Sequence, residues 1–188
     1  MAADVDLASR RTLLAIARHA VVAAVDRESY VDTPTVDRTL PVLSLRRGAF
    51  VTLHQHARLR GCIGRVEPDA PLRVLIPDVA RAAALSDPRF PPVRADDLAT
   101  IAIEISLLSV LEVVTDPGRI EVGRHGLLIA GRGRRGLLLP QVAVEYRWSR
   151  EEFLAEVCQK AGLAPDAWRA EGARLQSFTA DVFGEDDV

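Results

Sequence analysis

Residues 101–106 alternate strictly between isoleucine and a small or polar residue. Side chains of a β-strand have a period of two, so the isoleucines would share one face of an extended segment and Glu104 and Ser106 the other. A strand with one apolar face must bury that face, which requires a sheet and a covering layer. The chain therefore needs a fold that contains a half-buried sheet.

Apolar residues at helical spacing predict helices over about Asp6–Ser29 and over Pro71–Ser86. A third helix is predicted to start after Ser149, whose S-x-x-E sequence is a capping box, and to end at Gly162. The segment Val31–Pro41 has no periodicity and is expected to be extended or turning. Helices mixed with strands at irregular spacing favour an α+β fold over a regular βαβ array.

Further β-rich runs predict two hairpins and a closing strand. The first hairpin would pair Ala49–Gln55 with Leu59–Val66, and the second would join Leu127–Ala130 to Leu137–Leu139 through a GRGRRG turn. Alternation returns over Leu175–Val182, which predicts one closing strand.

Composition excludes several classes of protein. A length of 188 residues fits one domain, or two small lobes that share a core. The 24 basic and 26 acidic side chains leave a net charge of −2, so no global positive field attracts nucleic acid or an anionic membrane. No apolar run reaches the roughly 18 residues of a membrane span. Cys62 and Cys158 are too few for a disulfide framework, and with no signal segment in the sequence we expect a cytoplasmic protein.

The hexapeptide LRGCIG, residues 59–64, is the most informative motif. Its two glycines remove side chains on either side of a thiol, which lets a ligand or another backbone approach. Cys62 would then lie at a pocket floor, with Arg60 or Arg65 available to stabilise a thiolate or bind an anion. The alternative is a small buried residue beside a β-bulge, and the residue pattern alone favours this packing role.

Other polar residues each allow two interpretations. The sequence SDPRF would present Asp87 and Arg89 at a turn, either as a pair that fixes the loop or as ligand contacts. Glu104 would face either solvent or a partner inside a cleft. His54 and His56 share one face of their strand, as a metal pair would, but no further ligand at suitable spacing completes a site, so we predict no metal.

An arginine-rich stretch raises the question of nucleic acid. GRGRRG resembles a phosphate cradle only superficially, because a P-loop continues through Gly-Lys-Ser/Thr into a helix. Near-neutral charge and an aromatic content of 5% count against nucleic-acid binding, so we expect at most weak, salt-dependent affinity. The arginines that would carry it are Arg119, Arg124, Arg132, Arg134 and Arg135.

Six segments occur in one order: GAFVTLHQHARLRGCIGR, SDPRFPPV, IEISLLS, GRHGLLI, RGLLLPQVA and EEFLAEVCQKAGLAPDAW. Together they resemble the AMMECR family over roughly Thr12–Phe183, and similar bacterial members are called AmmeMemoRadiSam system protein A. The resemblance implies a single AMMECR domain, residues 1–188, with a two-lobed α+β fold of mixed or antiparallel sheets and flanking helices. The larger lobe would combine both chain ends, the smaller would come from a middle segment, and LRGCIG would line the cleft between them.

The resemblance also bears on function. The LRGCIG signature matches without departure and shifts the interpretation of Cys62 towards a functional cleft position. The system name implies association with a Memo-like protein of the extradiol-dioxygenase fold and with a radical-SAM protein. The resemblance carries no settled catalytic role for any residue, and it implies no cofactor.

The main hypothesis is therefore an enzyme, or an enzyme component, that acts on an unidentified small molecule. Cys62 would be the nucleophile or covalent attachment point, Arg60 an anion or oxyanion partner, and Glu104 or His54 a proton carrier. Acyl or amide transfer would be the simplest chemistry. The residues expected to contact the ligand are Gly61, Ile63, Gly64, Asp87 and Arg89.

Two other functions stay open at this point: a non-catalytic binding subunit of the same system, and a weak nucleic-acid binder. A homo-oligomer is also left open. If both chain ends build the larger lobe, one core should unite residues of the first and last helices and of the closing strand. These residues are Leu13, Ala17, Phe153, Val157 and Phe178.

Overall fold

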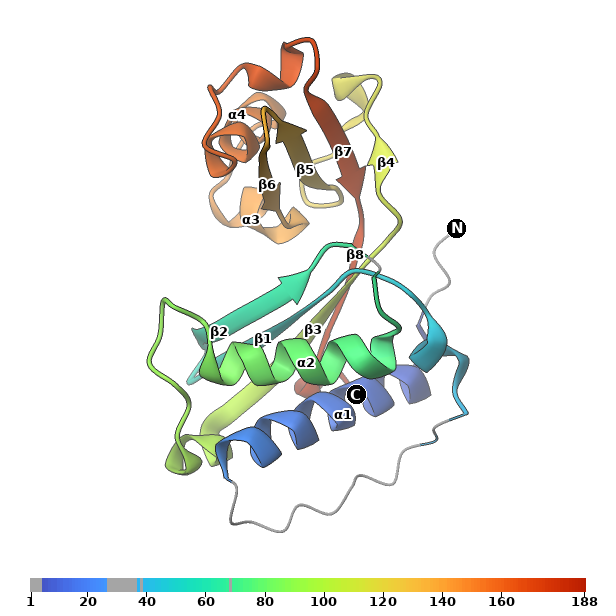
Figure 1. The fold of residues 1–188 in the computed structure, drawn as a ribbon, viewed down its shortest axis with the longest axis vertical. Helices are drawn as coiled ribbons and strands as arrows, with labels where there is room; N and C mark the ends of the chain where they lie inside the picture. Colours follow the sequence, from blue (N-terminus) through green and yellow to red (C-terminus); the bar gives the residue numbers. More distant parts are fainter. Residues whose placement is uncertain (1–4, 27–36, 38, 68) are drawn as a thin grey trace. The chain divides into compact units, whose positions relative to one another are not determined.

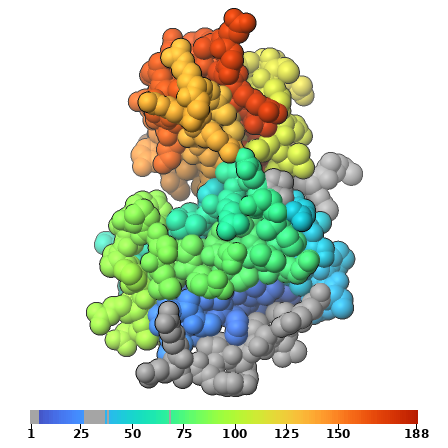
Figure 2. All heavy atoms as spheres, viewed as in Figure 1, coloured from blue at the N-terminus to red at the C-terminus, as the bar shows by residue number. Residues whose placement is uncertain are grey.

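The computed structural model describes residues 5–26, 37, 39–67 and 69–188. The chain forms two compact units (Figure 1; Figure 2). The first unit contains Met1–Leu108 and Asp181–Val188, and the second contains Ser109–Ala180. Within the described residues, none of the helices is long and apolar enough to cross a membrane.

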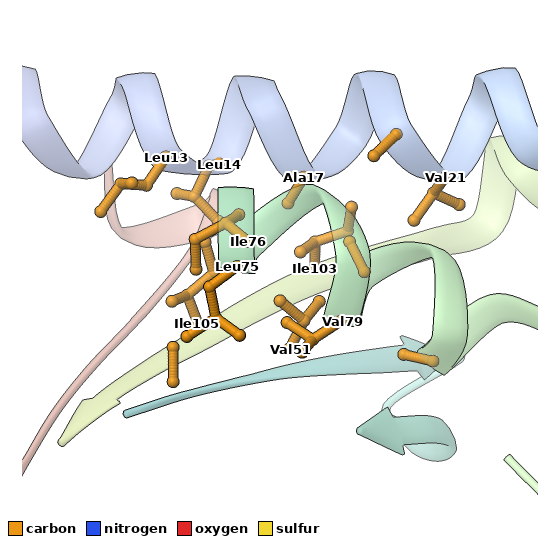
Figure 3. Packing of buried hydrophobic residues seen from close by; sticks show 14 of the residues in the cluster. Leu13, Leu14, Ala17, Val21, Val51, Leu75, Ile76, Val79, Ile103 and Ile105 are labelled. Carbon is orange, nitrogen blue, oxygen red and sulfur yellow. The ribbon is translucent and has the colours of Figure 1, made fainter. Parts of the chain in front are cut away.

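The first unit contains a four-stranded sheet in the order β2-β1-β3-β8, in which β1 pairs antiparallel with both β2 and β3. Two helices, α1 and α2, pack against each other and against one face of this sheet (Figure 1; Figure 3). The elements are α1 (Leu7–Val25), β1 (Ala49–Gln55), β2 (Arg58–Arg65), α2 (Leu72–Leu85), β3 (Ile101–Leu108) and β8 (Ala180–Gly184).

The first core lies between these helices and the sheet. Leu13 and Ala17 of α1 point towards the sheet, where Ile103 and Ile105 of β3 are fully or almost fully buried (Figure 3). Each large side chain buried in this way contributes roughly 1.5–3 kcal/mol to folding. The predicted isoleucine alternation is confirmed, and it leaves Glu104 and Ser106 on the face opposite the helices.

The second unit contains another antiparallel sheet, in the order β4-β7-β5-β6. Its longest helix, α4, begins at the predicted capping box, where the Ser149 hydroxyl accepts from the Glu152 N–H and the Glu152 carboxylate accepts from the Ser149 N–H. Two antiparallel sheets with flanking helices confirm the α+β fold. The elements are β4 (Glu112–Val113), β5 (Gly126–Gly131), β6 (Arg134–Leu138), α3 (Pro140–Glu145), α4 (Arg150–Lys160) and β7 (Arg174–Phe178).

Short 3₁₀ helices connect these elements. They are η1 (Pro41–Ser44), η2 (Ala95–Thr100), η3 (Pro117–Arg119), η4 (Ala167–Arg169) and η5 (Glu185–Asp187). Most of the expected extended loop at 31–41 lies outside the described residues. The first helix ends at Val25 with Asp26 as an extended C-cap, earlier than the predicted end near Ser29. Both predicted hairpins are present. The turn of the second is shorter than the expected GRGRRG, because Gly131 and the residues 134–136 pair within β5 and β6.

One expected closing strand is in fact two strands. β7 ends at Phe178 and pairs with β4 and β5, whereas β8 starts at Ala180 and belongs to the sheet of the first unit. Thr179 marks the change, because its N–H and C=O bond to Ser109 rather than to a sheet neighbour. An alternation of period two shows which residues share a face, and it carries no information on which sheet the strand joins.

The core of the first unit joins both chain ends, since Leu13 and Phe183 lie in it together, but the expectation that Phe153 and Val157 share this core is wrong. Leu13 and Ala17 belong to the core of the first unit, and Phe153 and Val157 belong to a separate core in the second. The reason is local: α4 packs on β5 and β6, the hairpin that precedes it in the sequence. Phe178 is buried on β7, next to Gly126.

Candidate functional site

Cys62 lies on β2, the edge strand of the first sheet. It pairs with Thr52 of β1, and Thr52 pairs on its other side with Glu104 of β3. These three side chains form a row on the face opposite α1 and α2, because their neighbours Val51, Ile63 and Ile105 face the core. The Thr52 hydroxyl lies 3.4 Å from Cys62 Sγ, and Cys62 is half-buried.

A carboxylate and a guanidinium hold the backbone of Cys62 from outside the sheet. The Cys62 N–H donates to Asp87 Oδ2 at 2.8 Å, and Arg89 Nη2 donates to the Cys62 carbonyl at 3.2 Å. Both polar groups of Cys62 therefore point away from β1, the arrangement in which paired side chains approach most closely. Asp87 and Arg89, here called the clamp, replace the strand that β2 lacks on its outer side.

The clamp is itself strongly hydrogen-bonded. Arg89 donates to Asp87 through Nε at 2.9 Å, Nη2 at 2.7 Å and its backbone N–H at 3.1 Å. Bonds from the Arg89 side chain lower the pKa of the buried Asp87 carboxyl far below its usual range, so it stays ionised. The pKa of Arg89 is raised, first by Asp87 and further by the neighbouring Cys62. A cation beside a cysteine is the setting in which thiolates react.

The two glycines of LRGCIG face protein atoms. A Cβ on Gly61 would lie 2.3 Å from the Ala83 carbonyl oxygen of α2, so Gly61 lets the helix backbone approach the sheet. A Cβ on Gly64 would lie 2.3 Å from the Phe50 ring, on the same face as Cys62. Ile63 packs against the first core. Gly61 and Ile63 thus serve the helix side of β2, away from the thiol.

Arg60 is the extra residue of a β-bulge. The register shifts so that Leu53 pairs with Gly61 and His54 with Leu59, which leaves Arg60 without a partner on β1. Its guanidinium donates to the carbonyls of Pro91 at 2.6 Å and Pro92 at 3.1 Å, and it lies 3.5 Å from Asp97. The cation beside Cys62 is therefore Arg89, and the Arg60 guanidinium holds the segment that leads to β3.

The histidines do not form a pair on one strand. His54 lies on β1, half-buried, two residues from Thr52 and so on the face of the Cys62 row. His56 lies in the hairpin turn with a φ of 51°, which corrects the expectation that both share a strand. In the part of the chain that the structure describes, no three His, Cys, Asp or Glu side chains are grouped to hold a metal ion.

Of the arginines considered for nucleic acid, Arg134 and Arg124 make protein contacts. Arg134 donates to the Gly162 carbonyl, and Arg124 bonds to Glu121 at 3.1 Å. Arg132 lies in the β5–β6 turn with a positive φ. No observation at these side chains favours a phosphate ligand.

Sequence reasoning missed Thr52, the residue that contacts the thiol. Its signal would have been strand register, because Thr52 becomes the partner of Cys62 once the 49–65 hairpin is aligned. The hairpin was predicted, but the bulge at Arg60 shifts every pair beyond it by one residue.

Comparison with known proteins shows which family this chain belongs to. The family model described as AMMECR1 matches residues 14–183. The chain belongs to the AMMECR1 family. This AMMECR1-family protein is 48% identical over 150 residues to Protein Mbar_A1807 of Methanosarcina barkeri, a match that covers 77% of this chain and 74% of that one. It is 47% identical over 152 residues to Protein MJ0810 of Methanocaldococcus jannaschii, covering 77% and 76%.

A solved structure supports the fold. The crystal structure of the uncharacterised protein PH0010 from Pyrococcus horikoshii matches this AMMECR1-family protein with a TM-score of 0.83 and 39% sequence identity. The match covers 93% of this chain and 90% of that one. Family and fold are thereby shown, and neither comparison names an activity.

Proposed function

We propose that this AMMECR1-family protein is an enzyme, or a component of one, that acts on a small molecule through the thiol of Cys62. The supporting observation is the clamp. Asp87 and Arg89 fix both backbone groups of a half-buried cysteine and place a cation beside it. A cysteine with only a packing role needs no such support, because packing requires no particular charge nearby.

The proposed roles follow from the neighbours of the thiol. Cys62 is the nucleophile, and Arg89 takes the part that the sequence suggested for Arg60. Thr52 donates a hydrogen bond to Sγ and keeps the sulfur oriented. Glu104 and His54 lie on the same face and are the candidate proton carriers.

The simplest reaction for this arrangement is acyl or amide transfer. The sulfur bonds to a carbonyl carbon of the small molecule while the bond from that carbon to its leaving group breaks. The proton of the thiol reaches the leaving group through Glu104 or His54, relayed by water because Glu104 lies two strands from Cys62. Water or an amine then attacks the acyl carbon, the carbon–sulfur bond breaks, and the proton of the attacking group passes through the same base to the released thiolate.

Timed alkylation tests the proposal. The native protein is treated with iodoacetamide, and both cysteine peptides are followed by mass spectrometry. Cys158 is an internal control, because it is fully buried and burial raises its pKa. We expect Cys62 to react at least about tenfold faster than Cys158 and faster than a short cysteine peptide. Slow labelling of both cysteines in the folded protein would remove the nucleophile and leave Cys62 a packing role.

The proposed partners rest on the family resemblance alone. The protein would work with a Memo-like protein and a radical-SAM protein, receiving a small molecule from one or passing it to the other. Co-purification of tagged protein from its own host tests this, with a Cys62→Ser variant as a second bait. We expect the same partners with both baits, because association does not require the thiol. If neither bait retains either protein, the proposed association is wrong.

A further inference from the structure

Arg89 uses only part of its hydrogen-bonding capacity on the protein. Nε and Nη2 donate to Asp87, and Nη2 also reaches the Cys62 carbonyl. Among the residues that the structure describes, Nη1 has no partner. The Arg89 side chain is 55% exposed, whereas that of Asp87 is 2% exposed.

The clamp therefore presents a positive end to solvent. The Asp87 carboxylate is buried against β2, whereas the Arg89 guanidinium is exposed to solvent. The pair is neutral overall, but a molecule that approaches from solvent meets the positive group. Two bonds to Asp87 also fix the guanidinium, so a ligand does not have to order a free arginine side chain. One fixed N–H donor group next to the backbone of a cysteine is suited to a single anionic oxygen group.

We propose that the molecule that reacts at Cys62 carries a carboxylate, which Arg89 binds through Nη1. This inference rests on the proposed function, since it assigns a substrate class to the same thiol. A singly charged carboxylate fits better than a phosphate, because phosphate sites combine several donors and this one offers a single free nitrogen.

Glu104, at the far end of the row that starts at Cys62, also favours binding of the carboxylate at Arg89. Glu104 lies two strands away from Cys62, about 10 Å at the usual spacing of neighbouring strands. Its negative charge disfavours an anion over the middle of the sheet. A carboxylate is therefore favoured at the outer edge of β2, where Arg89 lies.

Two alkylating reagents of nearly equal size test the inference. Iodoacetate carries a carboxylate and iodoacetamide does not, and both react in the same way: the thiolate sulfur bonds to the CH₂ carbon as iodide leaves. We compare the two rates at Cys62 with the two rates for a cysteine peptide in the same buffer. We expect the iodoacetate-to-iodoacetamide ratio at Cys62 to exceed the peptide ratio by about tenfold, the usual effect of a charge-assisted hydrogen bond.

Salt and variants identify the cause. About 1 M NaCl, which screens charges beyond ~3 Å, should lower the iodoacetate rate more than the iodoacetamide rate and so bring their ratio towards that of the peptide. Arg89→Gln should bring the ratio down to that of the peptide. Arg65→Gln is the matched control, because Arg65 is a half-exposed arginine of the same strand that pairs with Asp69 and Asp78. It should leave the ratio unchanged.

The outcomes separate the two proposals. If Cys62 reacts slowly with both reagents, the proposed function fails. If Cys62 reacts rapidly with iodoacetamide but its ratio equals that of the peptide and does not depend on salt, the thiol is reactive and the carboxylate inference is wrong. The salt experiment uses the unmodified protein, so it decides the matter even if Arg89→Gln fails to fold.

Discussion

Replacing Asp87 with alanine should destabilise the first unit and expose its dependence on the clamp. The substitution removes the acceptor for the Cys62 N–H, for the Arg89 N–H and for two guanidinium bonds. The two backbone bonds contribute roughly 0.5–1.5 kcal/mol each. The ion pair adds about 1 kcal/mol, since Arg89 is more than half exposed and solvent screens it. The expected loss in the free energy of unfolding is about 2–4 kcal/mol.

Urea unfolding followed by circular dichroism measures this loss. Asp78→Ala is the matched control, because Asp78 also pairs with arginine, here Arg65 and Arg81, but its side chain is 40% exposed. It should cost less than about 1 kcal/mol. Cys62 alkylation, measured where the Asp87→Ala variant is still folded, should slow as Arg89 loses its anchor. If Asp87→Ala proves no more destabilising than Asp78→Ala, the clamp contributes no stability and the argument from it fails.

Three further measurements test the rest of the structure. By urea unfolding, Gly61→Ala should lower the free energy of unfolding by about 1–3 kcal/mol, because the added Cβ is overpacked against α2. Gly131→Ala should lower it far less, because a Cβ there meets only ordinary contacts at 3.8 Å. Phe153→Ala should lower the free energy of unfolding by roughly 3–5 kcal/mol, because Phe153 is fully buried. Arg134→Ala, at an exposed hairpin tip, should lower it by less than about 0.5 kcal/mol. The pKa of Asp87 is lower in the folded protein than in the unfolded chain, so the stability that its charge contributes is complete above the unfolded pKa of about 3.9 and declines as pH falls below it. The difference in free energy of unfolding between the native protein and Asp87→Ala should therefore be constant at pH 5–7 and become smaller in stronger acid. A gap that stays constant into strong acid would contradict the proposed role of the Asp87 charge.

Features with a local cause could be predicted from the sequence. The hairpin at 49–65, the strand at 101–108 and the helix after Ser149 each depend on the pattern or cap of one segment. Even the polar face of β3 followed from its alternation, because the isoleucines determine where Glu104 points.

Features that join distant segments could not be predicted in this way. Asp87 lies 25 residues from Cys62, and nothing in SDPRF indicates that its carboxylate accepts a backbone N–H of another element. Arg60 adjoins the motif glycine in sequence, yet its guanidinium reaches carbonyls 31 and 32 residues away. Such contacts depend on how loops fold back on the sheet, which periodicity does not describe.

The position of the thiol follows from the glycine beside it. On β6, Gly136 faces the end of α4 almost as closely as Gly61 faces α2: a Cβ there would lie 2.5 Å from the Ala161 nitrogen and 2.8 Å from the Val157 carbonyl oxygen. In both units a strand glycine lets a helix backbone approach one face, and neighbouring residues must then point to the other face. On β2 that neighbour is Cys62, which is why the thiol lies away from the helices, beside Thr52. A change at Gly61 would therefore disturb the direction of the thiol as well as the packing of α2.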